Sequence, residues 1–296
     1  MIDGLLNSAA PLMLAGLGAL ITDLSGALGI FIEGFMTIGA FFSWVIAGRT
    51  GSVFWGTFLS ALFAGFTGWA LARFVRLSGA NPFIAGLALN LAATGITVSL
   101  SAAWFGTKGV LYQTSGMRHV ITIPGPVIIP FINDIPVVGQ IISGHNPFTY
   151  IALITVLLAA IVINRTVPGF RLRAAGLSPD AAAERGIRPG EYREWAWAAA
   201  AFLAALAGAA LTFRVGVYAP GGIAGRGWIA LAIVFLGFRK VWGVALAALV
   251  FSFAERTGFA VQSFGALPAT ALLGLPSALA LVFYCVSLLA KKKARH

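Results

Sequence analysis

Charged side chains are scarce in this chain. Asp, Glu, Lys and Arg together make up 10% of its 296 residues, whereas a soluble domain carries about 25%. Hydrophobic residues make up 59%, and the mean hydropathy is +0.92. This composition excludes an ordinary soluble enzyme and a disordered protein. Cysteine is nearly absent as well, because Cys285 is the only one, and a single cysteine excludes an intrachain disulfide.

Residues that carry out chemistry are also few. The three histidines, His119, His145 and His296, lack the spacing of a metal site, and no set of nucleophile and base is evident. The chain lacks the Gly-x-x-x-x-Gly-Lys-Ser/Thr run that binds the phosphates of ATP. No pattern of basic and aromatic residues points to nucleic acid. We therefore expect no enzyme activity, no metal, no cofactor and no nucleic acid partner on this chain.

Long apolar runs are what the sequence has instead. Stretches without Asp, Glu, Lys or Arg lie at residues 4–22, 50–72, 77–107, 135–164, 195–213 and 257–290. A helix that spans a membrane needs about 20 such residues. Shorter apolar runs lie at 34–48, 227–238 and 241–254. The pattern predicts an all-α membrane protein, a polytopic helical bundle of about 8–10 transmembrane segments in contact with lipid.

Basic residues outnumber acidic ones by 20 to 9, so that the formal net charge is +11. Most of them gather between the apolar runs, at 73–76, 165–193, 239–240 and 291–295. One alternating path places all of these groups on one face, which the positive-inside rule identifies as the cytoplasm. We therefore expect a multi-pass protein of the bacterial inner membrane, with its N-terminus outside and its C-terminus in the cytoplasm.

The same path predicts one transmembrane domain over residues 1–296, built of two halves. The first half covers about 1–147 and closes with an outer segment, 104–147, for which we expect contact with an extracytoplasmic protein or with solvent. A cytoplasmic loop follows at about 165–194. The second half covers about 195–290, and a basic cytoplasmic tail covers 291–296.

Two glycine-rich stretches echo each other in the two halves. GALGIFIEG at 26–34 and APGGIAGRG at 219–227 each end in a charged residue followed by glycine, and each precedes a short apolar span. Glycine in apolar sequence unwinds a helix or lets helices pack closely, and such interruptions in matching halves are typical of a transporter's central site. We therefore expect two Gly-interrupted helices in a pseudo-repeat, and one hypothesis pairs Glu33 with its counterpart Arg226. Ordinary tight helix crossings are the alternative.

The loop at about 165–194 contains the signals of a short helix away from lipid. Ser178 is a favourable N-cap, Pro179 fits the first helical position, and Gly186 is a fitting stop. A rigid, Arg-flanked helix between two spans predicts a docking element for a soluble partner. A solvated basic loop is the alternative. The candidate docking residues are Arg171, Arg173, Gly176, Ser178, Pro179, Ala182, Arg185 and Gly186.

Four motifs in the chain resemble those of a known family. They read GALITDLSG at 18–26 with IEGFMTIGAF at 32–41, FIAGLALNLA at 83–92, GFRLRAAG at 169–176 with AAERGI at 182–187, and GRGWIALAIVFLG at 225–237. In this order and spacing they resemble permease subunits of ABC importers for nucleosides and simple sugars. That family lies in the superfamily of branched-chain amino acid permeases, which has the type II importer fold. The chain's length resembles that of the smaller of two paired permeases.

The resemblance implies a set of partners. A second permease subunit, a larger homologue, would form one pathway with this chain. Two ATPase subunits or domains would bind the cytoplasmic loops and hold ATP and Mg²⁺, and an extracytoplasmic lipoprotein would deliver the substrate. The segment at 169–187 would be the ATPase-coupling loop. Coupling of this kind requires two discrete states of the permease that the ATPase biases.

Side chains at membrane depth supply candidates for the substrate pathway, namely Glu33, Phe35, Asn90, Thr94, Arg226 and Trp228. A charge at membrane depth costs about 2.5–3.5 kcal/mol or more, so Glu33 must face a cavity, a partner group or the interface. Asn90 and Thr94 share a helix face, and an amide can bind the edge of a nucleobase or flavin. The structural alternatives are an ion pair or helix-end anchor for Glu33, an interhelical hydrogen bond for Asn90, and core packing for the two aromatic residues.

These observations favour the pathway of an ATP-driven importer for an aromatic nutrient, with a nucleoside first and riboflavin or a simple sugar as alternatives. An ion-coupled secondary carrier is an alternative of another class, in which Glu33 would bind a proton or a sodium ion. A membrane scaffold without a pathway is a third possibility, and it leaves Glu33 and Arg226 unexplained.

Overall fold

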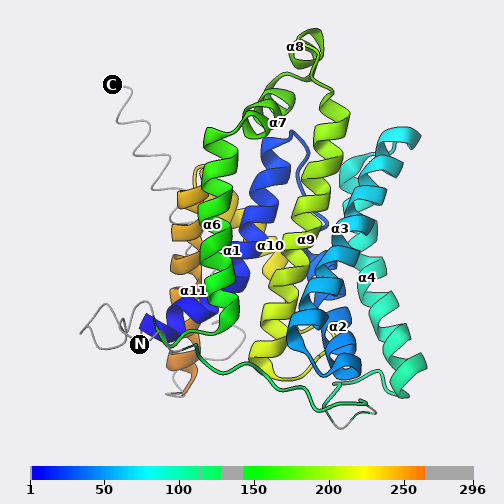
Figure 1. The fold of residues 1–296 in the computed structure, drawn as a ribbon, viewed down its shortest axis with the longest axis vertical. Helices are drawn as coiled ribbons and strands as arrows, with labels where there is room; N and C mark the ends of the chain where they lie inside the picture. The colour runs from blue at the N-terminus through cyan, green and yellow to red at the C-terminus, as the bar shows by residue number, and fades with distance from the viewer. Residues whose placement is uncertain (1, 114, 116, 128–142, 264–296) are drawn as a thin grey trace.

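A computed structural model describes residues 2–113, 115, 117–127 and 143–263, and helices dominate these ranges (Figure 1). In chain order the helices are α1 (Ile2–Leu24), α2 (Ile32–Thr50), α3 (Val53–Ser78), α4 (Pro82–Phe105), α6 (Pro147–Arg165), α7 (Val167–Leu177), α8 (Pro179–Glu184), α9 (Pro189–Val215), α10 (Arg226–Leu236) and α11 (Val241–Ser263). The β-type pairs in this part of the chain are two isolated bridges, Leu111 with Tyr218 and Val127 with His145. The prediction of an all-α protein is confirmed.

Five of the described helices are long and apolar enough to cross a membrane: α1 over Gly4–Leu24, α3, α4, α6 and α9. They run side by side, with α7 and α8 beyond one end of the bundle (Figure 1). The α10 helix has 11 residues and is too short to span alone, as the interrupted pattern predicts. A polytopic helical bundle is therefore confirmed.

Some boundaries differ from those that the sequence predicts. The second crossing, expected at about 24–48, becomes helical at Ile32, because turns around Gly26, whose φ is +81°, separate it from α1. The loop expected at about 165–194 is largely helical, since it holds α7, α8 and the beginning of α9. The last expected crossing, at about 266–290, and the tail at 291–296 lie outside the described residues.

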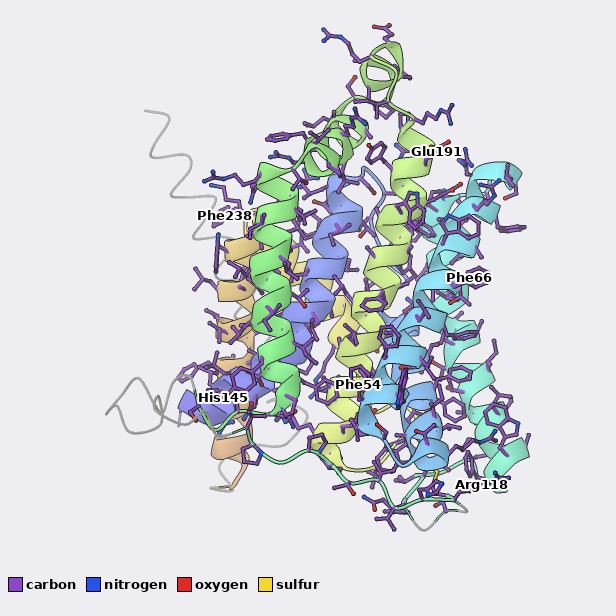
Figure 2. All side chains as sticks on the ribbon, viewed as in Figure 1. Phe54, Phe66, Arg118, His145, Glu191 and Phe238 are labelled. Atoms are coloured by element: carbon purple, nitrogen blue, oxygen red, sulfur yellow. The ribbon has the colours of Figure 1, made fainter. Side chains whose placement is uncertain are left out.

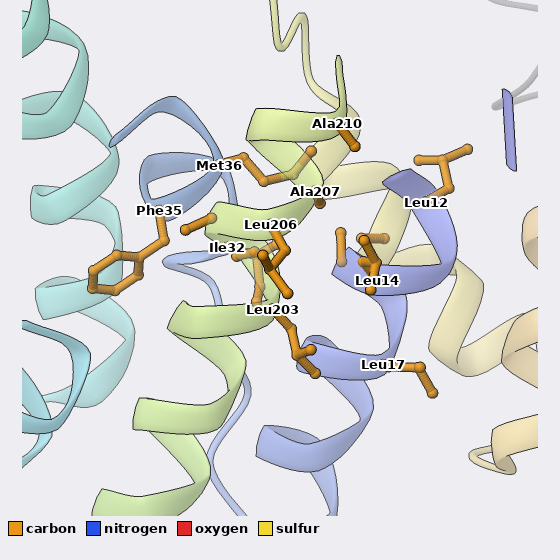
Figure 3. Packing of buried hydrophobic residues seen from close by; sticks show 14 of the residues in the cluster. Leu12, Leu14, Leu17, Ile32, Phe35, Met36, Leu203, Leu206, Ala207 and Ala210 are labelled. Atoms are coloured by element: carbon orange, nitrogen blue, oxygen red, sulfur yellow. The ribbon is translucent and has the colours of Figure 1, made fainter. Parts of the chain in front are cut away.

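The core lies where α9 packs against α1, α2 and α3 (Figure 3). Alanine and glycine let these backbones approach closely, as in other membrane bundles. A Cβ on Gly208 of α9 would overlap the carbonyl oxygen of Met36, and one on Gly39 of α2 would overlap the backbone of Ala205. The small residues of α9 therefore fix how α2 lies, and the position of α2 sets the site described below.

The outer helices turn large apolar side chains away from the core. Phe54 and Phe66 of α3 (Figure 2) are 68% and 64% exposed. Leu91 of α4 is 79% exposed. Since burying such side chains in apolar surroundings is favourable, this surface suits lipid or another membrane subunit rather than water. The α4 helix is the least covered of the spanning helices, because 17% of its most apolar window is buried.

Candidate functional site

The two Gly-interrupted helices begin close together inside the bundle and run in opposite directions. The α2 helix runs toward the outer segment, where the backbone N–H of His119 donates to the Gly48 carbonyl at 3.1 Å. The α10 helix runs toward the other end, where Nε of Arg239 lies 2.5 Å from Oδ2 of Asp23. Helix N-termini carry partial positive charge and unpaired N–H groups. Two such ends thus meet at one place, as in transporters with broken helices.

Glu33 joins these two helix ends. Its Oε1 accepts from the backbone N–H of Gly225 at 2.9 Å, and its Oε2 accepts from that of Gly227 at 2.6 Å. The carboxylate therefore caps the N-terminus of α10 from the first turn of α2. A Cβ on Gly227 would lie 2.5 Å from the backbone nitrogen of Glu33, so glycine is needed for this approach.

The predicted pair between Glu33 and Arg226 is wrong. The Arg226 guanidinium pairs with the carboxylate of Glu255 on α11 and donates to the carbonyls of Gly222 and Ile223. The contacts of Glu33 are those of the helix-end anchor named as the alternative. The sequence misses this arrangement because the groups that satisfy Glu33 are backbone N–H groups, which every residue but proline carries.

Asn90 of α4 forms hydrogen bonds with the backbone at the start of α2. Its Oδ1 accepts from the backbone N–H of Gly34 at 2.7 Å, and its Nδ2 donates to the carbonyl of Ile30 at 2.8 Å. Both functions of the amide are thus used within the chain, which is the interhelical hydrogen bonding named as the alternative. Thr94 is exposed on α4, and its hydroxyl donates to the Asn90 carbonyl at 3.3 Å.

The two aromatic candidates lie in different surroundings. Phe35 is fully buried, and its ring centroid lies 5.4 Å from that of Phe31, which in turn packs on Trp197. Phe35 therefore belongs to the core. Trp228, in the first turn of α10, is 46% exposed. Of the two, only Trp228 is exposed.

The expected docking helix exists as α8, with Ser178 at its N-cap, Pro179 at its first position and Gly186 beyond its end at φ +76°. The Ser178 side chain makes no capping hydrogen bond. Ala182 is 4% exposed, so it faces inward rather than toward a partner. Arg185 is exposed at the end of α8.

A second helix, α7, precedes α8 and was not expected. It carries Arg171, which is exposed, and Arg173, whose guanidinium lies 4.9 Å from the ring centroid of Phe170. Its start has a recognisable signal, because Thr166 is the N-cap and accepts from the backbone N–H of Gly169 at 3.5 Å. Gly176 lies in the last turn of α7, against the end of α1.

The basic groups at 73–76, 165–193 and 239–240 gather at the end of the bundle that bears α7 and α8, as the charge pattern predicts. Glu194 of α9, with a side chain 4% exposed, accepts from Nε of Arg76 at 2.6 Å and lies 3.7 Å from Arg73. Beside it, Nε of Arg193 donates to the carbonyl of Ser25 at 3.2 Å. These contacts tie α3, α9 and the end of α1 together.

A charged cavity that sequence reasoning missed lies near the other end of the bundle. It measures about 320 Å³ and is lined by Arg214, Arg226, Glu255 and Arg256 together with Ser8 and Thr212. The signal was present, since Arg214 and Arg256 border the apolar runs at 195–213 and 257–290. In the part of the chain that the structure describes, no three His, Cys, Asp or Glu side chains gather to hold a metal ion.

Comparison with known proteins identifies the family. The model of the branched-chain amino acid transport system permease component matches residues 1–290. The chain belongs to this family. It is therefore a type II ABC importer permease, a multi-pass membrane subunit in a family of proteins that are not themselves enzymes.

Three curated relatives match this permease over most of its length. A guanosine ABC transporter permease of Bacillus subtilis is 30% identical, and the alignment covers 83% of this chain and 78% of the length of that relative. A nucleoside ABC transporter permease of Lactococcus lactis is 29% identical, with 84% of this chain and 79% of the relative aligned. A glucose ABC transporter permease of Haloferax volcanii is 26% identical, with 94% of this chain and 74% of the relative aligned. No solved structure matches.

Proposed function

We propose that this permease forms, with a second permease subunit, the pathway of an ATP-driven importer for nucleosides. The similarity to the guanosine and nucleoside permeases supports the substrate class. A nucleoside offers a planar ring to stack and polar edges to bind. An extracytoplasmic lipoprotein would deliver it, touching the outer segment at 104–147.

The observation that carries ATP coupling is the pair of helices α7 and α8, which extends beyond the spanning helices on the Arg-rich end (Figure 1). We expect this end to face the cytoplasm, because Lys and Arg favour that side. Two ATPase subunits would dock there and carry ATP and Mg²⁺. The exposed side chains of Arg171 and Arg185 are suited to contact them.

The roles of the pathway candidates follow from their contacts. Glu33 and Asn90 are engaged by backbone groups, so we assign them to the framework that shapes the pathway. Thr94 and Trp228 are exposed, and we assign them to the surface that the substrate meets. The exposed face of α4 around Thr94 is where the second permease subunit would complete the pathway, since α4 is the least covered spanning helix.

Uptake by the complete importer, reconstituted in proteoliposomes, tests this proposal. Labelled guanosine should enter only with ATP and the cognate binding lipoprotein, and unlabelled nucleosides should compete while glucose and riboflavin do not. A complex with an inactive ATPase is the matched control. Uptake that survives in this control but collapses with an ionophore would refute ATP coupling and favour the ion-coupled carrier.

A simple sugar is the second candidate substrate, because the glucose permease aligns with 94% of the chain. The thermal stabilisation of the cognate lipoprotein, measured with glucose and with nucleosides, distinguishes the two candidate substrates. Stabilisation by glucose and not by nucleosides would replace the proposed substrate while leaving the importer assignment intact.

A further inference from the structure

The coupling segment touches the first helix break through two glycines. A Cβ on Gly176 of α7 would overlap the carbonyl oxygen of Leu24 and lie 2.8 Å from the backbone nitrogen of Gly26. A Cβ on Gly26 would lie 3.0 Å from Cα of Gly176. Backbone therefore packs directly on backbone here, with no side chain between to absorb a displacement.

The same break is held by the spanning helices. Gly26 has a φ of +81°, which favours glycine, and Nε of Arg193 on α9 donates to the carbonyl of Ser25 at 3.2 Å. The short segment 25–31 thus has α7 and α9 at one end and the first turn of α2 at the other.

The far end of this segment is the place where α2, α4 and α10 are joined. Ile30 and Gly34 are bonded to the Asn90 amide of α4, and Glu33 is bonded to the N–H groups of Gly225 and Gly227 at the start of α10. A shift of segment 25–31 must move or break these polar contacts. In an apolar bundle, leaving such groups unpaired is costly, so the contacts favour discrete arrangements.

We propose that Gly176 and Gly26 are positioning residues of a relay, which passes motion of α7 through segment 25–31 to the Glu33 junction between α2 and α10. The relay rests on the proposed function, since α7 moves in this way only if an ATPase drives it. Motion at the docking helices then changes how the two interrupted helices abut, and so opens or closes the pathway between them.

The variant Gly176→Ala tests the relay in the reconstituted importer complex. The added methyl group forces α7 away from Leu24 and loosens the contact. Gly65→Ala on α3 is the matched control, because its Cβ would meet Ala198 and Phe202 at ordinary distances of 3.4 Å. Arg193→Met is a milder variant, since it removes one donor to Ser25 and leaves both glycines in place.

Three measurements are made on each complex: uptake, ATP hydrolysis, and hydrogen exchange at the amides of Gly34, Gly225 and Gly227 with and without trapped nucleotide. In the wild type and in Gly65→Ala, trapped nucleotide should change exchange at these amides. In Gly176→Ala we expect uptake to fall about tenfold, within the usual range of coupling between sites, while hydrolysis persists and the nucleotide-dependent change in exchange is lost. Arg193→Met should show the same pattern, weaker.

The outcomes separate the relay from the function on which it rests. ATP-driven uptake and a nucleotide-dependent exchange change of wild-type size in Gly176→Ala would overturn the relay alone. If Gly176→Ala does not assemble, Arg193→Met decides, and wild-type behaviour of that variant overturns the relay. Uptake by the wild type that is independent of ATP would overturn the proposed function instead.

Discussion

At the scale of single residues, the decisive feature is a carboxylate whose partners are backbone groups. Glu33 is a charge at membrane depth, yet both of its oxygens accept hydrogen bonds from N–H groups at the start of α10. Hydrogen bonds to an ionised acceptor are stronger than neutral ones, and a helix N-terminus favours a negative charge. This arrangement offsets part of the cost of placing a carboxylate at this depth.

Glu33→Gln should therefore loosen the junction. The amide loses the charge and can accept only with its one oxygen, so we expect a loss of about 1.5–3 kcal/mol in stability and slower uptake. Thermal denaturation of the purified complex measures the first effect, and proteoliposome uptake measures the second.

Arg226→Gln is the control for this prediction, since it leaves the two acceptors of Glu33 in place. Hydrogen exchange at Gly225 and Gly227 should speed up in Glu33→Gln and stay near the wild-type rate in Arg226→Gln. Faster exchange in Arg226→Gln, together with exchange near the wild-type rate in Glu33→Gln, would instead support the pair between Glu33 and Arg226.

At the scale of helices, burial decides which side of α8 is open to a partner. Ala182 is 4% exposed, whereas Ala183 is exposed. A charge at Ala182 would disturb the packing of α8 itself, because a buried charge without a partner is costly. The surface that a partner can touch therefore runs through Ala183 and Arg185.

Ala183→Asp should lower uptake through loss of the ATPase. A negative charge on the exposed side of α8 is expected to weaken ATPase docking, so that uptake falls at least about fivefold with the permease still folded. Co-purification of the ATPase and the uptake rate are the readouts. Ala182→Asp should instead lower the melting temperature, and a folded Ala182→Asp permease with normal uptake would contradict the assigned orientation of α8.

The tie between α3 and α9 gives a second prediction at this scale. Glu194 is buried, and its partners Arg73 and Arg76 are partly exposed, at 48% and 40%. Glu194→Gln should destabilise the permease by about 1–3 kcal/mol, because it removes the buried charge that pairs with the two guanidinium groups. The loss stays within this range because these partly exposed guanidinium groups can recover part of their solvation. Thermal unfolding tests this, with Glu191→Gln as the control, because the side chain of Glu191 is 47% exposed. Equal melting temperatures for both variants would mean that the buried pair contributes nothing.

At the scale of the whole molecule, the distribution of charge predicts the orientation. The basic groups at 73–76, 165–193 and 239–240 share the end that bears α7 and α8, and the positive-inside rule assigns that end to the cytoplasm. The described residues 106–113, which include Lys108, lie at the opposite end (Figure 1).

Cysteine labelling of intact cells tests this orientation. In a variant in which Cys285, the one cysteine of the chain, is replaced by Ala, Lys108→Cys should react with a membrane-impermeant maleimide from outside. Ala183→Cys should react only after the membrane is permeabilised. Labelling of Ala183→Cys in intact cells would invert the topology and remove the docking role of α8.

Much of the fold follows from the sequence because its signals are local. The length of an apolar run determines whether a helix spans the membrane, and Ser178, Pro179 and Gly186 mark where α8 begins and ends. The sequence therefore predicts the spanning helices in the described part of the chain, the breaks and the short helix α8. It misses α7, although Thr166 and Pro168 signal its start.

The sequence by itself determined that this chain is a helical membrane bundle with a basic end and two interrupted helices, because apolar length, charge and glycine act over a few neighbouring residues. Only the tertiary structure decided which groups meet. Glu33 accepts hydrogen bonds from the start of α10, and Asn90 is hydrogen-bonded to the backbone at the start of α2. Gly176 packs against the end of α1. Their partners are peptide groups, which every residue carries, so nothing in the order of side chains singles them out.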